Sequence, residues 1–136
     1  MTQIPVDTHG REEMVDITRA VQDAVNASGC RNGLCTVQCA HTTAGLTINE
    51  NADPDVVHDI LLSLDEIVKN LRGFRHGEGN STAHVKSSLV GVTVCVPVED
   101  GRLALGTWQG IYFCEFDGPR NRRVWVTCVP AVETGA

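Results

Sequence analysis

Cys39-Ala-His-Thr-Thr-Ala-Gly-Leu-Thr-Ile-Asn-Glu50 is the stretch around which the rest of this chain is organised. It begins at the end of one apolar run and continues as a second, so we expect two strands joined by a polar break. His41 lies in the break, and Asn49 and Glu50 close the second run. A strand that only packs does not need an imidazole, an amide and a carboxylate so close together. We therefore interpret the stretch as one wall of a functional site.

A second stretch matches the first. It reads Gly73-Phe-Arg-His-Gly-Glu-Gly-Asn-Ser-Thr-Ala-His-Val-Lys86 and supplies His76 and His84 from a glycine-rich loop. Functional loops on a rigid scaffold often have this composition. A short turn of helix is expected from Ala83 to Ser88. We predict that the two stretches face each other across one site.

Two longer helices are expected from the hydrophobic pattern. The first has its cap at Asp16 or Thr18, carries an apolar stripe at a period of 3.6 residues, and ends at Gly29. The second begins at Asp53-Pro54, a good cap followed by a residue suited to the first helical position. A wide apolar stripe continues from there to Leu71, which makes this the most secure helix of the chain.

The remaining segments favour strands separated by turns. An edge strand is expected within residues 6–15, followed by strands at 34–40, 44–48, 90–98, 103–105, 110–116 and 124–129. Asp100-Gly101 is a hairpin signal. Helices combined with a mostly antiparallel sheet system predict an α+β fold with β-sandwich-like sheets. We expect one domain over residues 1–136, since this length is that of a single domain.

Composition excludes several classes of protein. The apolar fraction of 42% favours a globular domain over disorder. The net charge of −6 argues against a nucleic-acid partner, which needs a basic face. No apolar run is long enough to span a membrane, and the N-terminus has no signal-peptide pattern. A cytoplasmic protein without a membrane partner is therefore expected.

The six cysteines contain no Cys-x-x-Cys pair, so their spacing does not favour a cysteine zinc site. Four lie in apolar, strand-like runs, where cysteine behaves as a small hydrophobic residue: Cys35, Cys95, Cys114 and Cys128. We expect buried free thiols, because disulfides are rare in cytosolic proteins.

The histidines suggest a metal centre. His41, His76 and His84 would bind one divalent ion, zinc above all, and leave one position open, as catalytic zinc sites do. Glu50 would serve as base or as a further ligand. His58, near the start of the second helix, could face the Asn49–Glu50 end of the strand. The spacing is no known zinc signature, and a cluster of hydrogen-bonded histidines is the alternative.

Groups that suit a phosphate form a further set. The Gly77–Ser81 loop could cradle an anion with its backbone N–H groups, and Lys86 could add an ammonium. Arg120, next to Arg122 and Arg123, could bind phosphate through two hydrogen bonds. A surface loop and a solvated turn are the alternatives. Trp108, between two glycines, either stacks on a planar ring or packs in the core or a subunit interface.

Several of these motifs resemble one family, the YjbQ-like proteins. The segments that resemble the family are His41–Glu50, Asp53–Asp59, Ala83–Gly91, Gly106–Ile111 and Asp117–Arg120. The resemblance covers about residues 10 to 130. The four histidines His41, His58, His76 and His84 fall where the family pattern has histidine. Phe74 stands where the family usually has tyrosine, and the loop before Ala83 is shorter than usual.

The resemblance implies a β-sandwich-like subunit that assembles as a homotrimer. It also implies a secondary thiamine-phosphate synthase, which joins hydroxymethylpyrimidine diphosphate to a thiazole phosphate and releases diphosphate. The alternative is a non-catalytic metal- or metabolite-binding trimer. Mg²⁺ could accompany a diphosphate substrate. The expected catalytic residues are Glu50, His58 and His84, the substrate-binding residues are Asn49, Asn80, Lys86, Trp108 and Arg120, and the metal ligands are His41, His76 and His84.

Overall fold

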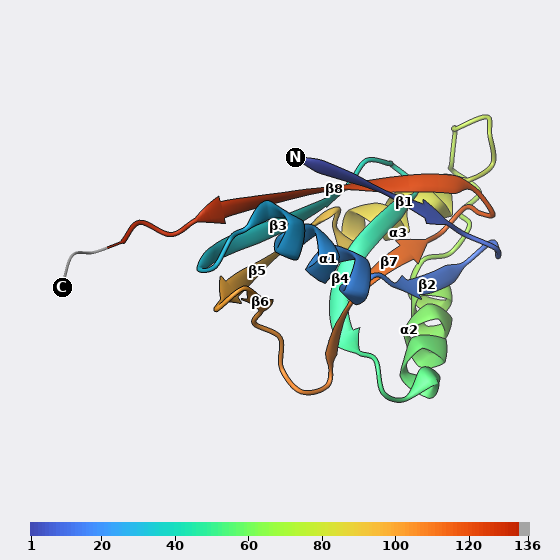
Figure 1. The fold of residues 1–136 in the computed structure, drawn as a ribbon. Helices are drawn as coiled ribbons and strands as arrows, with labels where there is room; N and C mark the ends of the chain where they lie inside the picture. The colour runs from blue at the N-terminus through green and yellow to red at the C-terminus, as the bar shows by residue number, and fades with distance from the viewer. Residues whose placement is uncertain (134–136) are drawn as a thin grey trace.

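The computed structural model describes residues 1–133, which form eight strands and three helices (Figure 1). The α+β class expected from the sequence is confirmed. The strands are β1 (Thr2–Asp7), β2 (Glu13–Asp16), β3 (Gly33–Cys39), β4 (Ala44–Glu50), β5 (Thr93–Glu99), β6 (Arg102–Leu103), β7 (Gln109–Glu115) and β8 (Asn121–Pro130). The helices are α1 (Thr18–Ser28), α2 (Pro54–Ile67) and α3 (Ser81–Val90).

The strands form two antiparallel sheets. The larger has the order β1-β8-β3-β5-β6, and the smaller has the order β2-β7-β4. The single edge strand expected within residues 6–15 is wrong, because the chain turns after Asp7 and places β1 and β2 at the edges of different sheets. The backbone N–H of Thr8 donates to the carbonyl oxygen of Arg120 at 3.0 Å and holds this crossing in place.

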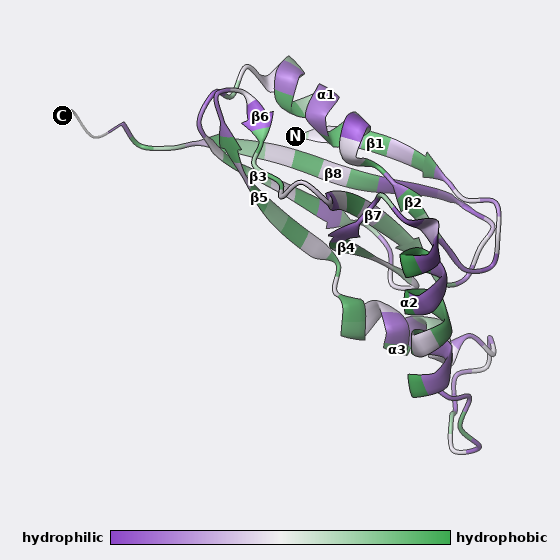
Figure 2. Ribbon diagram, turned by 90° about the horizontal axis from the view of Figure 1, so that it is seen from below, coloured by the Kyte–Doolittle hydropathy of each residue, from purple (hydrophilic) through white to green (hydrophobic). Residues whose placement is uncertain are grey.

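β7 is the central strand of the molecule, since both of its faces are buried. Ile111 and Phe113 point into the core between the two sheets. Tyr112 and Cys114 point the opposite way, into a second core beneath α2 and α3. The strands therefore lie between α1 on one side and the pair α2 and α3 on the other (Figure 2).

α1 has the expected extent, but its N-cap position is occupied by Ile17, without a side-chain cap hydrogen bond, and not by Asp16 or Thr18. Asp16 accepts hydrogen bonds from the backbone N–H and the hydroxyl of Thr18 at 2.9 and 2.6 Å. Gly29 ends the helix with a φ of 73°, the left-handed conformation that glycine adopts without strain. Val21 and Val25 are fully buried in the main core.

α2 begins as expected, with the Asp53 carboxylate accepting from the Asp55 N–H at 2.9 Å. It ends at Ile67, earlier than the apolar stripe suggested. None of its residues is buried, although the helix is apolar along one side. α2 has 14 residues, and none of the helices within residues 1–133 has the length and apolar character that crossing a membrane requires.

α3 is a full helix of 10 residues where only a short turn was expected. It packs against β4 at Gly45, where an added Cβ would lie 2.6 Å from the Gly91 carbonyl oxygen. The same oxygen accepts from the Leu46 N–H at 3.0 Å, and the Ser87 hydroxyl donates to the Ala44 carbonyl at 2.7 Å. Only glycine allows this close approach, which fixes α3 beside the start of β4.

All six cysteines lie within the described residues and stand as free thiols. Cys35 of β3 and Cys128 of β8 are opposite each other in the larger sheet, and burial with the nearby Cys128 raises the pKa of Cys35 to about 12. Cys95 was expected to be buried but is exposed, because it points to the outer face of the sheet.

Candidate functional site

The two organising stretches meet at a cavity of about 390 Å³. It lies where the β3–β4 loop, the loop before α3, the start of α3 and the start of β8 come together. Its wall contains Ala40, His41, Thr42, Thr43, His76, Glu78, Asn80, His84, Arg120 and Arg122. We call it the anion cavity, because two arginines and three histidines line it. Among residues 1–133, Glu78 is the only residue with a carboxylate in its wall.

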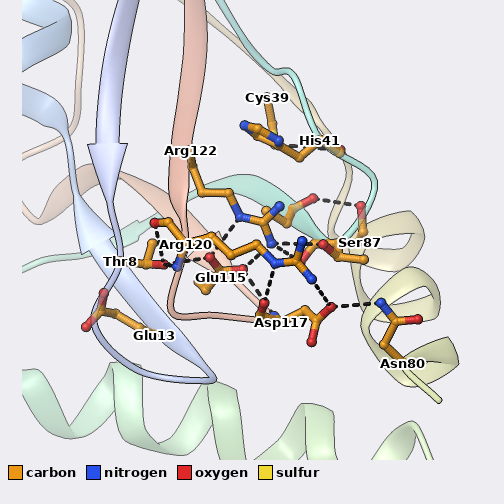
Figure 3. A network of polar contacts seen from close by, with 12 residues as sticks. Thr8, Glu13, Cys39, His41, Asn80, Ser87, Glu115, Asp117, Arg120 and Arg122 are labelled. Atoms are coloured by element: carbon orange, nitrogen blue, oxygen red, sulfur yellow. Dashed lines mark hydrogen bonds and ion pairs between the residues drawn. The ribbon is translucent and has the colours of Figure 1, made fainter. Parts of the chain in front are cut away.

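A buried ion pair forms the base of the anion cavity. Glu115, at the end of β7, is fully buried, and its carboxylate accepts from both Nε and Nη2 of Arg122 on β8 (Figure 3). The same carboxylate accepts from the Thr8 hydroxyl at 2.6 Å and the Asp117 N–H at 3.1 Å. Arg122 Nη2 also donates to the Thr43 hydroxyl at 2.8 Å. The pair thus ties the two sheets together beneath the cavity.

This network keeps Glu115 ionised. Burial by itself would raise the pKa of Glu115, but the hydrogen bonds from Arg122, Thr8 and the Asp117 amide lower the pKa below its ordinary value. A carboxylate at this position holds the Arg122 guanidinium in one orientation. Its hydrogen bonds use Nε and Nη2, so Nη1 is the atom left for a ligand.

Asp117 positions the other side of the anion cavity. One of its carboxylate oxygens accepts from Asn80 Nδ2 at 2.8 Å and from Arg120 Nη2 at 2.9 Å. Arg120 Nε also donates to the Asp117 carbonyl at 2.9 Å, so this guanidinium is held at two atoms. Asn80 Oδ1 is buried and has no hydrogen-bond partner among residues 1–133. It is therefore an unpaired acceptor within the cavity wall.

His41 lies half-buried above the two arginines (Figure 3). Its Nε2 accepts from the Arg123 backbone N–H at 2.9 Å, which leaves Nδ1 as the protonated nitrogen of the neutral ring. Burial, with the positive charges of Arg122 and Arg123, lowers the pKa of His41. The free protein therefore holds a neutral imidazole here at pH 7.

His76 and His84 form a pair across the cavity from His41. Their rings meet edge to face, with centroids 5.2 Å apart, and His76 Nε2 lies 3.7 Å from a Glu78 oxygen. Within residues 1–133, no three His, Cys, Asp or Glu side chains stand together in an arrangement that could hold a metal ion. The three histidines thus share one cavity, but their present arrangement does not fit the expected zinc ligand set.

Four other predicted site residues lie far from this cavity. Glu50, Asn49 and Trp108 are at the opposite end of the smaller sheet, where Glu50 pairs with Gln109. β4 has seven residues from Ala44 to Glu50, and its ends are roughly 20 Å apart at the usual rise per residue. His58 is exposed on α2, and its Nδ1 lies 3.0 Å from the Asp59 carboxylate. Of the three expected catalytic residues, only His84 lines the anion cavity.

Lys86 was expected to contact a phosphate, and the structure places it elsewhere. It is 3% exposed and points from α3 toward α2 and the segment before β2. Its ammonium donates to Glu12 at 3.0 and 3.1 Å and also to Asp65. Burial raises the pKa of Glu12 against the lowering effect of Lys86, whereas the hydrogen bond from Lys86 lowers the pKa of Asp65. Lys86 therefore joins three structural elements instead of facing the cavity.

Reasoning from the sequence missed Glu115 and Thr43, and it did not single out Arg122 from its neighbours. A signal for Glu115 existed, since it is the one charged residue in the run Ile111-Tyr-Phe-Cys-Glu-Phe116. A charge in a strand buried on both faces requires a partner of opposite charge. Arg122, seven residues later, meets that need.

Known proteins match the chain along nearly its whole length. The family model described as "UPF0047 protein YjbQ-like" matches residues 2–131. UPF0047 protein YugU of Bacillus subtilis is 53% identical over 124 residues, which cover 90% of this chain and 94% of YugU. UPF0047 protein MJ1081 of Methanocaldococcus jannaschii is 49% identical over 124 residues, 91% of this chain and 90% of that protein.

Solved structures agree with these matches. An uncharacterised YjbQ/UPF0047 protein from Clostridium acetobutylicum superposes with a TM-score of 0.92 at 50% identity, covering 95% of this chain and 100% of the other. A YjbQ-like protein of unknown function from Sulfolobus solfataricus superposes with a TM-score of 0.90 at 35% identity, covering 96% of each chain. Sequence, fold and extent all coincide, and the chain therefore belongs to the YjbQ-like UPF0047 family.

Proposed function

We propose that this protein is an enzyme acting on a phosphorylated small molecule bound in the anion cavity, in the manner of a secondary thiamine-phosphate synthase. The observation that carries the proposal is the pair of guanidinium groups, Arg120 and Arg122, each held in place by its own carboxylate. Guanidinium groups fixed in this way match the geometry of phosphate oxygens. The volume of about 390 Å³ suits a small ligand.

The N-terminus of α3 supports the same ligand class. Asn80 and His84, from the first turns of this 10-residue helix, line the cavity together with the arginines. The positive end of a helix favours an anion, and the charged side chains beside it add to that attraction. His41 is neutral in the free protein and can take up a proton when a negative ligand arrives.

In the proposed reaction, diphosphate leaves a pyrimidine-bearing carbon. Arg120, Arg122 and the amides at the start of α3 would stabilise the charge that develops on the leaving group. His84 and His41, which line the same cavity, would donate a proton or a hydrogen bond to these oxygens. Removal of one such contact typically lowers turnover by ~10²–10³.

The test is formation of thiamine phosphate from hydroxymethylpyrimidine diphosphate and thiazole phosphate by the purified protein. Arg120→Ala and His84→Ala should lower turnover by about 10²-fold or more while the circular dichroism spectrum is unchanged. His9→Ala, an exposed residue outside the cavity, is the matched control. Near-normal turnover by folded His84→Ala would place the chemistry elsewhere.

Calorimetry with diphosphate separates the enzyme from a binding protein that uses the same cavity. Tight binding that is lost in Arg120→Ala, without turnover of any phosphorylated substrate, would favour the non-catalytic alternative. A lack of diphosphate binding by the folded protein would contradict both. Mg²⁺ would enter together with the diphosphate, because this ion is commonly held through substrate phosphates.

Zinc binding is kept as a separate proposal for His41, His76 and His84. No step of the proposed reaction depends on it, because the three rings do not form a ligand set as placed. His41 would have to release the Arg123 amide or use its other nitrogen. Metal analysis of untagged protein, and calorimetry with Zn²⁺ on the wild type and His76→Ala, would decide it.

A homotrimer is the assembly that we propose for this subunit. α2 buries none of its residues, and Leu62 and Ile67 on it are 53% and 70% exposed. Leu71 and Leu89 nearby are also more than half exposed. A neighbouring copy would cover this apolar surface. Any role of the distant Glu50 or Trp108 in the reaction would require such a neighbour.

A further inference from the structure

The anion cavity continues into a second and larger cavity of about 740 Å³. The two share Ala40, His41, Thr42 and His84, so they are halves of one site and not separate hollows. The second half extends along the C-terminal part of α3 and over the end of the larger sheet. Its wall is mainly apolar and includes Cys39, Val92 and Trp125, whereas the wall of the anion cavity is mainly polar.

Trp125 is the only tryptophan, tyrosine or phenylalanine among the described residues that line this second half. It lies on β8, half-buried, opposite Gln38 of β3. Its indole Nε1 donates to the Gln3 side chain at 3.2 Å, and the Arg123 guanidinium carbon lies 5.9 Å from the ring centroid. The polar end of the indole is therefore satisfied and the ring is held in one place, so its free surface is available to an apolar, planar partner.

The junction between the two halves determines how a ligand can lie. His41 and His84 belong to both walls, which places a linking group of the ligand beside their imidazoles. On one side are fixed guanidinium groups for an anion, and on the other are an indole and apolar surface. Neither an isolated phosphate nor an isolated ring would contact both the guanidinium groups and the apolar surface.

We propose that the double cavity binds one molecule in which an aromatic or heteroaromatic ring is joined by a short linker to a phosphate or diphosphate. The ring lies against Trp125, and the phosphate lies between Arg120 and Arg122. The phosphate half of this inference rests on the proposed function, while the ring half rests on the second cavity alone. Trp125 thus takes the ring-binding role that the sequence suggested for Trp108, which is 62% exposed at the other end of the molecule.

The chain offers a direct reporter, because it contains only two tryptophans. In Trp108→Phe, Trp125 is the single source of tryptophan fluorescence. Phenyl phosphate should change its emission on binding, and inorganic phosphate should leave the emission nearly unchanged. By calorimetry, phenyl phosphate should bind about tenfold more tightly than inorganic phosphate, a gain typical of one aromatic contact.

Variants separate the two halves of the site. Trp125→Ala should reduce phenyl phosphate affinity to that of inorganic phosphate and leave the affinity for inorganic phosphate unchanged. Arg120→Ala should weaken both ligands by the same factor. Leu34→Ala, on the same outer sheet face but outside both cavities, is the matched control. Trp125→Phe, which keeps an aromatic ring, should retain most of the gain, and Trp125→Leu replaces Trp125→Ala if that variant fails to fold.

The outcomes distinguish this inference from the proposed function. If inorganic phosphate binds and phenyl phosphate binds no more tightly, the ring compartment is refuted and the phosphate site stands. If phenyl phosphate gains affinity, but Trp125→Ala or Trp125→Leu keeps the whole gain and the emission of Trp108→Phe does not change on binding, Trp125 is not the ring contact. If neither ligand binds to folded protein, both proposals fall.

Discussion

At the scale of single residues, the pair Glu115–Arg122 decides whether the cavity exists. Glu115 has no exposed surface and Arg122 is 6% exposed, so each removes the cost of burying the other. Breaking such a pair by removing one partner usually costs about 3–5 kcal/mol. The orientation of Arg122 that the proposed phosphate site would use therefore follows from the need of the fold to neutralise Glu115.

The first prediction concerns acid stability. The pKa of Glu115 is below its ordinary value in the folded protein, so its contribution is complete above about pH 4.5 and is lost as the pH falls through the folded pKa. Glu115→Gln should lower the free energy of unfolding by about 3–5 kcal/mol at pH 7. The difference from the wild type should shrink as the pH falls below 4.5, as measured by urea denaturation. An equal difference at all pH values would contradict the assignment.

The second prediction concerns the charge of His41. Because burial and two arginines lower its pKa, His41 should titrate below the ordinary value of 6.5 in the free protein. The negative charge of diphosphate bound between Arg120 and Arg122 opposes the effect of the positive charges near His41. The pKa of His41 should therefore rise when diphosphate binds. Histidine ring resonances in an NMR pH titration, assigned with a His41→Gln spectrum, measure both states. His9, which is exposed, should show no change on adding diphosphate.

Some residues of the site could be predicted and others could not. The convergence of His41, His76 and His84 was visible because each stretch carries polar residues that packing does not require. Glu50 was misplaced because it is close to His41 in sequence, whereas an extended strand carries it to the other end of the sheet. Lys86 was misplaced because it follows His84 by two residues in a helix. Side chains two residues apart in a helix point to different faces.

At the scale of elements, α3 connects the fold with the site. Its start and His84 line the anion cavity, its C-terminal half borders the ring cavity, and Lys86 on its other face contacts α2. The composition of residues 81–90 indicated only a turn, since the segment has four serines and threonines near its ends and a weak apolar stripe. Packing against β4 and β7 stabilises the helix, and that is a tertiary effect that local propensity does not contain.

The third prediction tests the contact between α3 and β4. Gly45→Ala places a methyl group 2.6 Å from the Gly91 oxygen and 3.2 Å from Val90 Cγ1, so α3 must shift. We expect a loss of about 1–3 kcal/mol in unfolding free energy and weaker diphosphate binding, because His84 moves with the helix. Gly73→Ala, where an added Cβ meets nothing within 4 Å, is the control. Unaltered binding by Gly45→Ala would show that the position of α3 does not set the site.

The fourth prediction reverses the role suggested for Lys86 by its sequence position. Lys86→Met leaves Glu12 and Asp65 without their shared cation, and it should lower the unfolding free energy by about 1–3 kcal/mol. Diphosphate affinity should change less than about twofold, because the ammonium is outside both cavities. Lys69→Met removes an exposed ion pair to Glu66 and should cost no more than about 1 kcal/mol. A large affinity loss in Lys86→Met would restore the original interpretation.

At the scale of the whole molecule, the uncovered side of α2 predicts assembly. In size-exclusion chromatography with light scattering, the measured mass of the wild-type protein should be about three times the 14.7 kDa of one chain. The double variant Leu62→Lys, Ile67→Lys should be monomeric with an unchanged circular dichroism spectrum, since it places charges on an apolar contact. Glu66→Lys, an exposed change on the same helix, should leave the trimer intact. A monomeric wild type at micromolar concentration would refute the assembly.

The pairing of β1 with β8 joins Thr2 to Val126, almost the whole length of the chain. During synthesis on the ribosome, the first strand therefore has no pairing partner until residues 121–126 have been made. Glu115 leaves the exit tunnel before Arg122, and β3 lacks its central neighbour until the same moment. Contacts between such distant segments slow folding. A product that stops before residue 121 would thus be a target for chaperones and proteases, and not a smaller version of the protein with a partial site.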